Sequence, residues 1–459
     1  MHPNEELREL AYRKAKNIYG KKLPGKVLER LERELIFIIE NELSSVYLTL
    51  SYLVERNSLK HFEWCVRGIG WNSFVAYLCG FTPLNPLPPH YVCIHDKVSD
   101  FLVKNARMSC QLPDRECPIC GSKMSKLGES LPQELYMPKA VYKGKGKHKI
   151  QIDVGHNNLN EIESSLEEIS NEFGDCFLKK DYYIWEITPF AIFDFIKALY
   201  KSTNVSPESI DIEAEDVINV FRNRESIGLS YSTYRGYPLG TRGVIDGDDL
   251  LDLLLISKPK SFNDLIHVKG IYHSTGLLTS GQWEKLSSKQ ISISNMITSV
   301  EDFYETMIDC GISKKDALLN AELLRRGKDI DSNIISVFFD KLEESDEVNL
   351  KDQVFNAEYV FPRAWIIYLT MRLYWLAYYK FNFPNEFYNE YFRIFASDSE
   401  MEVISGGWKC IKKQLNAMDY KLENRSKINT FELAIEMIER QMMQVDTNKI
   451  WLYYHGNKF

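Results

Sequence analysis

The sequence predicts a mostly helical α+β protein, and three observations support this fold class. Apolar residues recur at helical spacing along most of the 459 positions, as in Leu28, Leu31 and Leu35. Only two short segments, 150–154 and 182–187, alternate apolar and polar residues as half-buried strands do. A stretch rich in proline and cysteine, residues 83–120, fits neither period and predicts an irregular loop.

Composition sets the broad class of the protein. With 44% hydrophobic and 26% charged residues, the chain is expected to form two to four globular domains. No apolar stretch reaches the roughly 20 residues of a membrane span, and no signal peptide is recognised. Nine cysteines with a single CxxC pair favour a reducing compartment, so a cytoplasmic location is expected. The net charge of −8 argues against a protein that coats nucleic acid, but not against a local groove.

The first half of the chain is predicted to contain helices, the loop and a small sheet. Residues 1–60 form a helical lead-in, and a short helix follows over 73–79. In the strand 150–154, Gln151 and Asp153 share one face. A helix over 160–173 then leads to the second strand, and pairing of the two strands would bring Asp153 close to Glu186.

The second half is predicted to be largely helical from residue 190 onward, with turns near 235–247 and 273–281. The tail is expected to contain a helix over 430–444 and a strand over 450–454. The predicted division is therefore 1–60, 61–189, 190–400 and a small C-terminal α/β segment, 401–459. An aromatic series at helical spacing, 374–391, is assigned to the core in preference to base stacking.

The cysteines of the loop predict a metal site. Cys117 and Cys120 have the spacing with which two thiolates bind one tetrahedral ion, for which zinc is the usual choice. Cys93 lies upstream in a Cys-x-His arrangement, which favours a bound metal over a CxxC pair that binds nothing. The fourth ligand is either His95, preferred for its softer nitrogen, or Asp96, and Cys110 is a substitute. Such a closed site, within about residues 90–125, would be structural.

The densest basic patch is the run from Lys143 to Lys149, in which glycines alternate with lysines. Glycine lets the backbone approach a phosphate closely, so Lys147 and Lys149 are candidate nucleic-acid contacts. A solvated loop explains the same run equally well.

Residues 85–93 (NPLPPHYVC), followed 24 positions later by Cys117-Pro-Ile-Cys120, resemble the palm region of PolC-type bacterial DNA polymerase III alpha subunits. Residues 67–73 stand where this family carries a Gly-Ser-rich, phosphate-contacting stretch, and Arg67, Gly68 and Ser73 match it. The family places a second Cys where this chain has Asp96. The resemblance implies a nucleotidyltransferase-like palm sheet with a zinc loop, followed by a large helical fingers-like domain.

The resemblance also implies that the catalytic residues are degenerate. The family holds two divalent ions with an Asp-x-Asp strand and a third Asp on a neighbouring strand. Here the pair reads Gln151-Ile-Asp153 and the third position is Glu186. Because Mg²⁺ favours anionic oxygen ligands, two-metal binding is expected to be weakened. Only 33 positions separate Asp153 from Glu186, so the thumb that the family inserts there is expected to be absent.

Three further segments resemble the family's fingers in the same order: 239–242, 270–275 and 360–365. They make Arg242, His273 and Arg363 candidate phosphate or template contacts. Trp365 replaces a family His that faces the incoming nucleotide.

Three functions fit this pattern. The leading expectation is a catalytically impaired PolC-like protein that binds DNA or replisome components, in a mobile element or in phage defence among other settings. The alternative enzyme is a minimal DNA polymerase that uses Asp153, Glu186 and Mg²⁺, with Asp175 or Asp181 recruited nearby. The third is a protein-binding mimic that competes for PolC partners.

Overall fold

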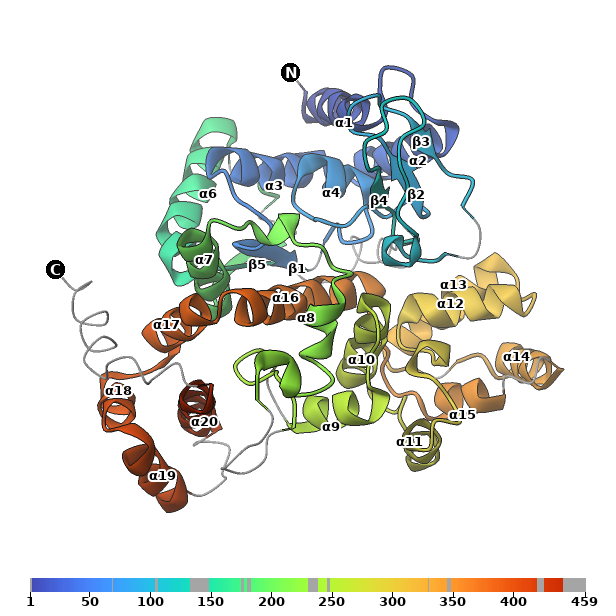
Figure 1. Ribbon diagram of the computed structural model, residues 1–459. Coiled ribbons are helices and arrows are strands. Elements are labelled where there is room, and N and C mark those ends of the chain that lie inside the picture. The colour runs from blue at the N-terminus through green and yellow to red at the C-terminus, as the bar shows by residue number, and fades with distance from the viewer. Residues whose placement is uncertain are drawn as a thin grey trace. The chain divides into compact units, whose positions relative to one another are not determined.

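The computed structural model describes residues 2–67, 69–103, 106–132, 148–174, 177–179, 183–229, 238–245, 248–328, 330–344, 348–418 and 425–440. The mostly helical α+β class is confirmed, because within these residues two three-stranded sheets accompany a large set of helices (Figure 1). The chain divides into two compact units. One comprises residues 1–190, 273–283 and 295–368, and the other comprises 191–272, 284–294 and 369–459. The four-part division expected from the sequence stays a prediction.

The first unit begins with the predicted helical lead-in, which is confirmed as α1 (Pro3–Tyr19), α2 (Gly25–Glu40) and α3 (Ser44–Arg56). The short helix expected after the glycines is α4 (Phe74–Cys79). The apolar faces of these helices share one core with the first sheet, and Leu7, Leu31 and Phe74 are fully buried in it. Burial of this periodic apolar face is what holds the helices together.

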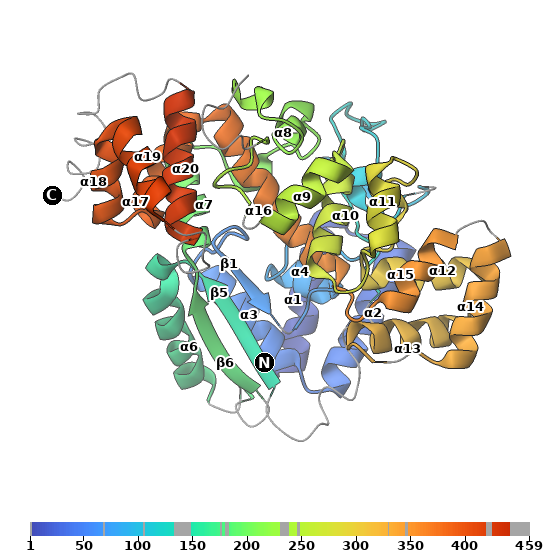
Figure 2. The same cartoon turned by 90° about the horizontal axis from the view of Figure 1, so that it is seen from below.

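The first sheet has the strand order β1 (Trp64–Arg67), β5 (His148–Val154) and β6 (Tyr183–Pro189). β1 pairs antiparallel with β5, whereas β6 runs parallel to β5. Parallel neighbours need a crossover, and α6 (Leu159–Phe173) provides it after the turn η3 (His156–Asn158) (Figure 2). Both predicted strands and the helix between them are confirmed. Ile150, Ile152 and Val154 point into the core, so the alternate residues of β5 lie on the opposite face.

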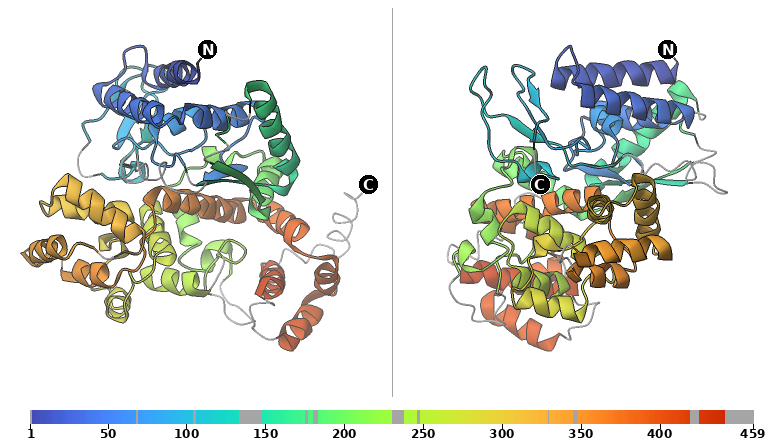
Figure 3. Two further views of the ribbon diagram at one scale, coloured as in Figure 1. Left: turned by 180° about the vertical axis from the view of Figure 1, so that it is seen from behind. Right: turned by 90° about the vertical axis from the view of Figure 1, so that its right-hand side faces the viewer.

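The second sheet belongs to the loop and has the order β3 (Ser99–Asp100), β2 (His90–Val92) and β4 (Ser125–Leu127). A short turn, η1 (Ser109–Gln111), lies between β3 and β4 in the chain. Figure 3 shows the strands of this loop, drawn in teal, from two further sides. The loop buries a small core of its own, which consists of Tyr91, Cys93, Leu112, Cys117 and Met124. The rest of the unit is helical: α12 (Val300–Asp309), α13 (Lys314–Arg325), α14 (Ser332–Glu344), α15 (Val348–Asn356) and the first turns of α16 (Arg363–Asn382).

The second unit is helical throughout its described residues. It contains, wholly or in part, α7 (Ala191–Thr203), η4 (Pro207–Ser209), α8 (Glu215–Asn219), η5 (Glu225–Ile227), α9 (Asp248–Ser257), α10 (Phe262–His273), α11 (Ser280–Ser287), the later turns of α16, α17 (Pro384–Phe395), α18 (Asp398–Ser405), α19 (Gly407–Ala417) and α20 (Arg425–Glu439). The aromatic series is core as expected, because Tyr374, Trp375, Tyr379 and Phe387 are buried. The strand predicted over 450–454 lies outside the described residues. No helix in the described part of the chain has the length and apolarity needed to cross a membrane.

Candidate active-site face and metal centre

The predicted catalytic residues meet on the face of the first sheet that lies opposite the main apolar core. The parallel register places Glu186 opposite Gln151, and Thr188 opposite Asp153. The antiparallel register of β1 places Arg67 opposite Gln151. Residues that oppose one another share a face, so these side chains form one surface across three strands.

Asp153 lies at the centre of this face, with only 2% of its side chain exposed. Nη2 of Arg67 lies 2.5 Å from its Oδ2, and Nε2 of Gln151 donates a hydrogen bond of 2.9 Å to its Oδ1. The thiol of Cys65, also on β1, is 3.7 Å from Oδ2. Both carboxylate oxygens therefore have donors from the protein itself, and the guanidinium balances the charge of the carboxylate.

Arg67 is held in place by aromatic rings as well as by Asp153. Its guanidinium carbon lies 5.4 Å from the ring centre of Trp365 and 5.5 Å from that of Phe190, within range for cation–π attraction. Trp71 packs edge-on against Trp365, with 4.9 Å between ring centres. The tryptophan that replaces the family's histidine thus helps to enclose Arg67.

Glu186 is more exposed and also has a cation beside it. Its carboxylate forms an ion pair with Lys149, and the two side chains are 40% and 55% exposed. Lys149, a candidate DNA contact from the sequence, is thus engaged with Glu186 on the same face. Two carboxylates on the face are matched by two cations. Asp175 and Asp181, which the sequence offered as further carboxylates, lie outside the described residues, as do Gly68 and Lys147.

Ser73, which the sequence predicts as a nucleotide contact, is fully buried. Its hydroxyl caps α4 by accepting from the backbone N–H of Ala76 at 3.1 Å, and it donates to Oε2 of Glu34 at 2.7 Å. The Glu34 carboxylate also accepts from the backbone N–H groups of Phe74 and Val75, at 2.9 and 3.0 Å. The anion-binding groups at the start of α4 are therefore saturated by a carboxylate from α2.

Sequence reasoning missed the role of Glu34, although a signal was present. Glu34 and Arg30 are the polar residues in a helical stripe whose other members, such as Leu31 and Leu35, are apolar and buried. A carboxylate in such a stripe must find donors inside the protein.

Two of the three candidate contacts in the fingers-like segments are likewise engaged with protein groups. Arg363, with 1% of its side chain exposed, pairs with Asp302 at 2.7 Å and with Glu305 at 2.6 Å. Arg242 is paired with Glu432, and both side chains are 11% exposed. The Arg363 guanidinium is therefore buried and the Arg242 guanidinium is largely covered, and each is engaged in an ion pair within the protein. His273 stacks on the ring of Phe361, with 5.0 Å between ring centres.

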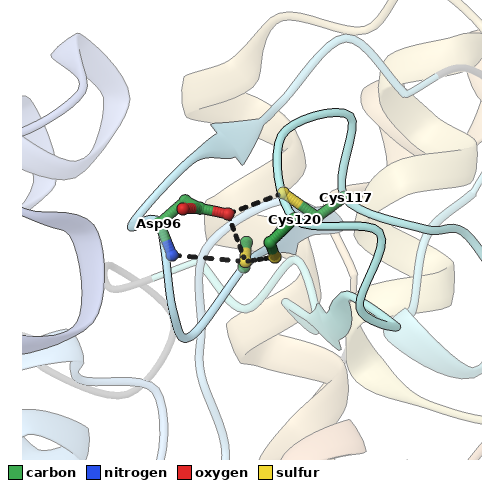
Figure 4. Close-up of side chains that lie close together, drawn as sticks. Asp96, Cys117 and Cys120 are labelled. Carbon is green, nitrogen blue, oxygen red and sulfur yellow. Dashed lines mark hydrogen bonds between the residues drawn. The ribbon is translucent and has the colours of Figure 1, made fainter.

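The predicted metal ligands converge in the loop (Figure 4). Ligand atoms of Cys93, Asp96, Cys117 and Cys120 all lie within 4.8 Å of one another. The Sγ atoms of Cys93 and Cys120 are 3.6 Å apart, and Oδ2 of Asp96 is 3.3 Å from Sγ of Cys117. Tetrahedral zinc with Zn–S bonds near 2.3 Å needs ligand atoms roughly 3.8 Å apart. Three thiols and a carboxylate at these separations fit one zinc ion.

Two similar turns deliver the four ligands. The backbone N–H of Lys97 donates to the carbonyl of Cys93 at 3.0 Å, and that of Gly121 donates to the carbonyl of Cys117 at 2.9 Å. Each turn thereby brings the side chain three positions after its first Cys beside that Cys. The N–H of Asp96 also donates to the Cys93 sulfur at 3.4 Å, which lowers the pKa of that thiol and favours the thiolate that binds metal.

The fourth side chain of the cluster is Asp96, so the preference for His95 from ligand softness is corrected by the geometry of the turn. Neither His95 nor Cys110 belongs to the clustered group among the residues that the structure describes. Residue spacing decides which side chain joins the ligand cluster, because a Cys-x-x-Asp turn has the same shape as the Cys-x-x-Cys turn.

Comparison with known proteins finds similarity to one kind of protein. Residues 5–150 match the family model described as the bacterial DNA polymerase III alpha NTPase domain. Across 95% of its length, the chain is 25% identical to DNA polymerase III PolC-type from Caldanaerobacter subterraneus subsp. tengcongensis. It is 26% identical to the Staphylococcus haemolyticus protein and 24% identical to the Bacillus subtilis protein, both described as DNA polymerase III PolC-type, over the same share. The chain is therefore a relative of PolC-type DNA polymerase III, as its motifs predict.

The match covers only part of each relative. The chain spans 38% of the Caldanaerobacter protein and 37% of the Bacillus protein. The alignment with the former nevertheless runs over 537 positions, more than the 459 residues of this chain. The relative therefore carries residues inside the aligned region that have no counterpart here.

Proposed function

We propose that this chain is a catalytically impaired PolC-like protein that serves as a DNA-binding or replisome-binding scaffold in DNA replication. The observation that carries the proposal is the neutralisation of Asp153 by Arg67 and Gln151. In a two-metal nucleotidyltransferase this carboxylate would hold divalent ions. In this chain the guanidinium of Arg67 occupies the position beside Asp153 that a divalent metal ion would need.

The ion pairs on the sheet face also argue against binding of divalent metal ions there. A divalent ion would have to separate Arg67 from Asp153 and Lys149 from Glu186, and Gln151 would offer it only a neutral amide oxygen. Mg²⁺ gives up its water reluctantly and needs anionic oxygens in near-octahedral geometry. Asp153 is only 2% exposed, although Arg67 is 44% exposed, so removing its counter-ion would leave a buried charge unpaired, which is costly.

A binding role fits what the chain retains. Its relatives are described as DNA polymerases, and this chain keeps a three-stranded sheet with α6 as the crossover between β5 and β6. Zinc is the proposed structural ion of the loop, with Cys93, Asp96, Cys117 and Cys120 as ligands, and it would supply rigidity. Proposed partners are a primer-template or a single strand of DNA, or replisome proteins, in the cytoplasm. A gene of a mobile element or of a phage-defence system is a setting compatible with such a role.

The test is primer extension on a short primer-template with Mg²⁺ or Mn²⁺ and all four dNTPs, with a gel shift of the same DNA. We expect a gel shift without extension, and no change in either signal for Asp153→Ala. Extension that disappears in Asp153→Ala would overturn the proposal in favour of a minimal polymerase that uses Asp153 and Glu186. Absence of both signals would favour the protein-binding mimic, which is then tested by binding to PolC partners.

A further inference from the structure

The metal loop, residues 90–127, buries only a small apolar core around its metal-ligand candidates. Its core has five buried residues, and two of them, Cys93 and Cys117, are ligands. This core is distinct from the main apolar core of the unit, which the loop joins at its base through Val92, Phe101 and Leu127. The part of the loop that carries the ligands therefore has little apolar burial to hold it, and structural metals supply folding free energy in such small units.

The loop carries one arginine that docks on α12. Nη2 of Arg107 lies 2.6 Å from Oδ2 of Asp309, and its Nη1 lies 3.5 Å from Oε2 of Glu305. Val103 and Ala106, just before Arg107 in the chain, pack against the small core that contains the ligands. The position of Arg107 is therefore set by the same core that the metal would complete.

A second contact joins Ser109 of the loop to the buried carboxylate of Glu129. The Ser109 hydroxyl donates to the buried carboxylate of Glu129, and the Ser109 backbone N–H lies 3.4 Å from its other oxygen. The positive charge of Arg363, the first residue of α16, stabilises the charged form of the Glu129 carboxyl. Glu305 is shared, because it accepts from Arg363 at 2.6 Å and pairs with Arg107.

We propose that the metal loop is a metal-dependent clasp, by which we mean a segment that docks on α12 only when its ion is bound. A thiophilic divalent ion binds to Cys93, Asp96, Cys117 and Cys120 and thereby fixes residues 106–111. Arg107 then docks on the acidic side chains of α12. Loss of the ion releases Arg107 and Ser109, and removes partners from Glu305, Asp309 and Glu129. The coupling concerns the first unit alone and does not depend on whether the protein binds DNA.

The experiment is hydrogen–deuterium exchange, read by mass spectrometry on the full chain loaded with Zn²⁺ and again after a thiophilic chelator. We expect faster exchange in the metal loop and also in α12 after chelation. The Arg107 contact is a partly exposed ion pair, so the change in α12 is expected to be roughly two- to fivefold. Faster exchange in the loop with α12 unchanged, or no change in either segment, would overturn the clasp.

Three variants separate the clasp from general destabilisation. Arg107→Ala and Asp309→Asn remove the same ion pair from its two sides, and Asp309 is 65% exposed, so its replacement does not threaten the fold. Each is expected to raise exchange in α12 of the Zn²⁺-loaded protein while the loop stays protected. Lys123→Ala is the matched control, because Lys123 pairs with Asp114 inside the loop and both side chains are exposed. If Lys123→Ala raised exchange in α12 as much as Asp309→Asn, the assignment to Arg107 would be wrong.

Discussion

Glu34 is a fully buried carboxylate whose removal should strongly destabilise the first unit. It lies on α2, has no exposed surface, and pairs with Nε of Arg30. Its oxygens also accept from the Ser73 hydroxyl and from the N–H groups of Phe74 and Val75. The change to test is Glu34→Ala.

The expected loss follows from what the substitution leaves behind. Arg30 would keep two backbone carbonyls as acceptors, those of Asn72 and Leu131, but it would lose its counter-ion at 9% side-chain exposure. Removing one partner of a buried ion pair costs about 3–5 kcal/mol. The hydroxyl and two amides left without acceptors add to that cost, although such effects are not additive.

Calorimetry of thermal unfolding measures the effect. For a unit of this size, the loss corresponds to a fall in Tm of roughly 6–10 °C. Glu32→Ala is the matched control on the same helix, because Glu32 pairs with Arg8 where both side chains are about one-third exposed. Its removal should change stability by about 1 kcal/mol or less. Equal and small shifts for the two variants would refute the reasoning that Glu34 organises the start of α4.

Two further predictions concern the metal loop and its neighbour Glu129. Asp96→Cys should bind Zn²⁺ more tightly than the natural chain, because a fourth thiolate suits zinc better than a carboxylate, and Asp96→Ala should bind it more weakly. Competition with a chromogenic chelator measures the three affinities. Equal affinities would remove Asp96 from the ligand set. Burial raises the pKa of Glu129 to about 7 from its ordinary 4.5, so between these values the folded protein holds a proton that the unfolded chain has lost. Its contribution to stability is complete below about pH 4.5 and is lost as the pH rises through about 7. Urea unfolding at pH 5 and pH 8 should show this fall in the natural chain and a smaller one in Glu129→Gln; an unchanged difference would contradict the burial argument.

Much of the fold follows from sequence periodicity. The strand over 150–154 and the helix after it were predictable, because apolar alternation and helical spacing report which face each element buries. The metal loop was predictable from the spacing of Cys117 and Cys120. Local pattern was sufficient in each case.

Pairings between distant segments were not predictable from local pattern. The contact of Arg67 with Asp153 depends on β1 joining the sheet in a particular register, and β1 is only four residues long. Arg363 and Arg242 looked like phosphate contacts, because a sequence does not show which acidic side chains will bury beside them. The choice between His95 and Asp96 was set by turn geometry, which ligand softness does not describe.

The most direct test of the account is Mn²⁺ binding to the Zn²⁺-loaded protein, followed by electron paramagnetic resonance. The account predicts that the natural chain has no Mn²⁺ site that depends on Asp153, because Arg67 already neutralises that carboxylate. The double variant Arg67→Ser with Gln151→Asp should gain such a site, since an ion would then compensate the buried charge. A Mn²⁺ site in the natural chain that disappears in both Asp153→Asn and Glu186→Gln would contradict the claim that this face has lost its metal chemistry.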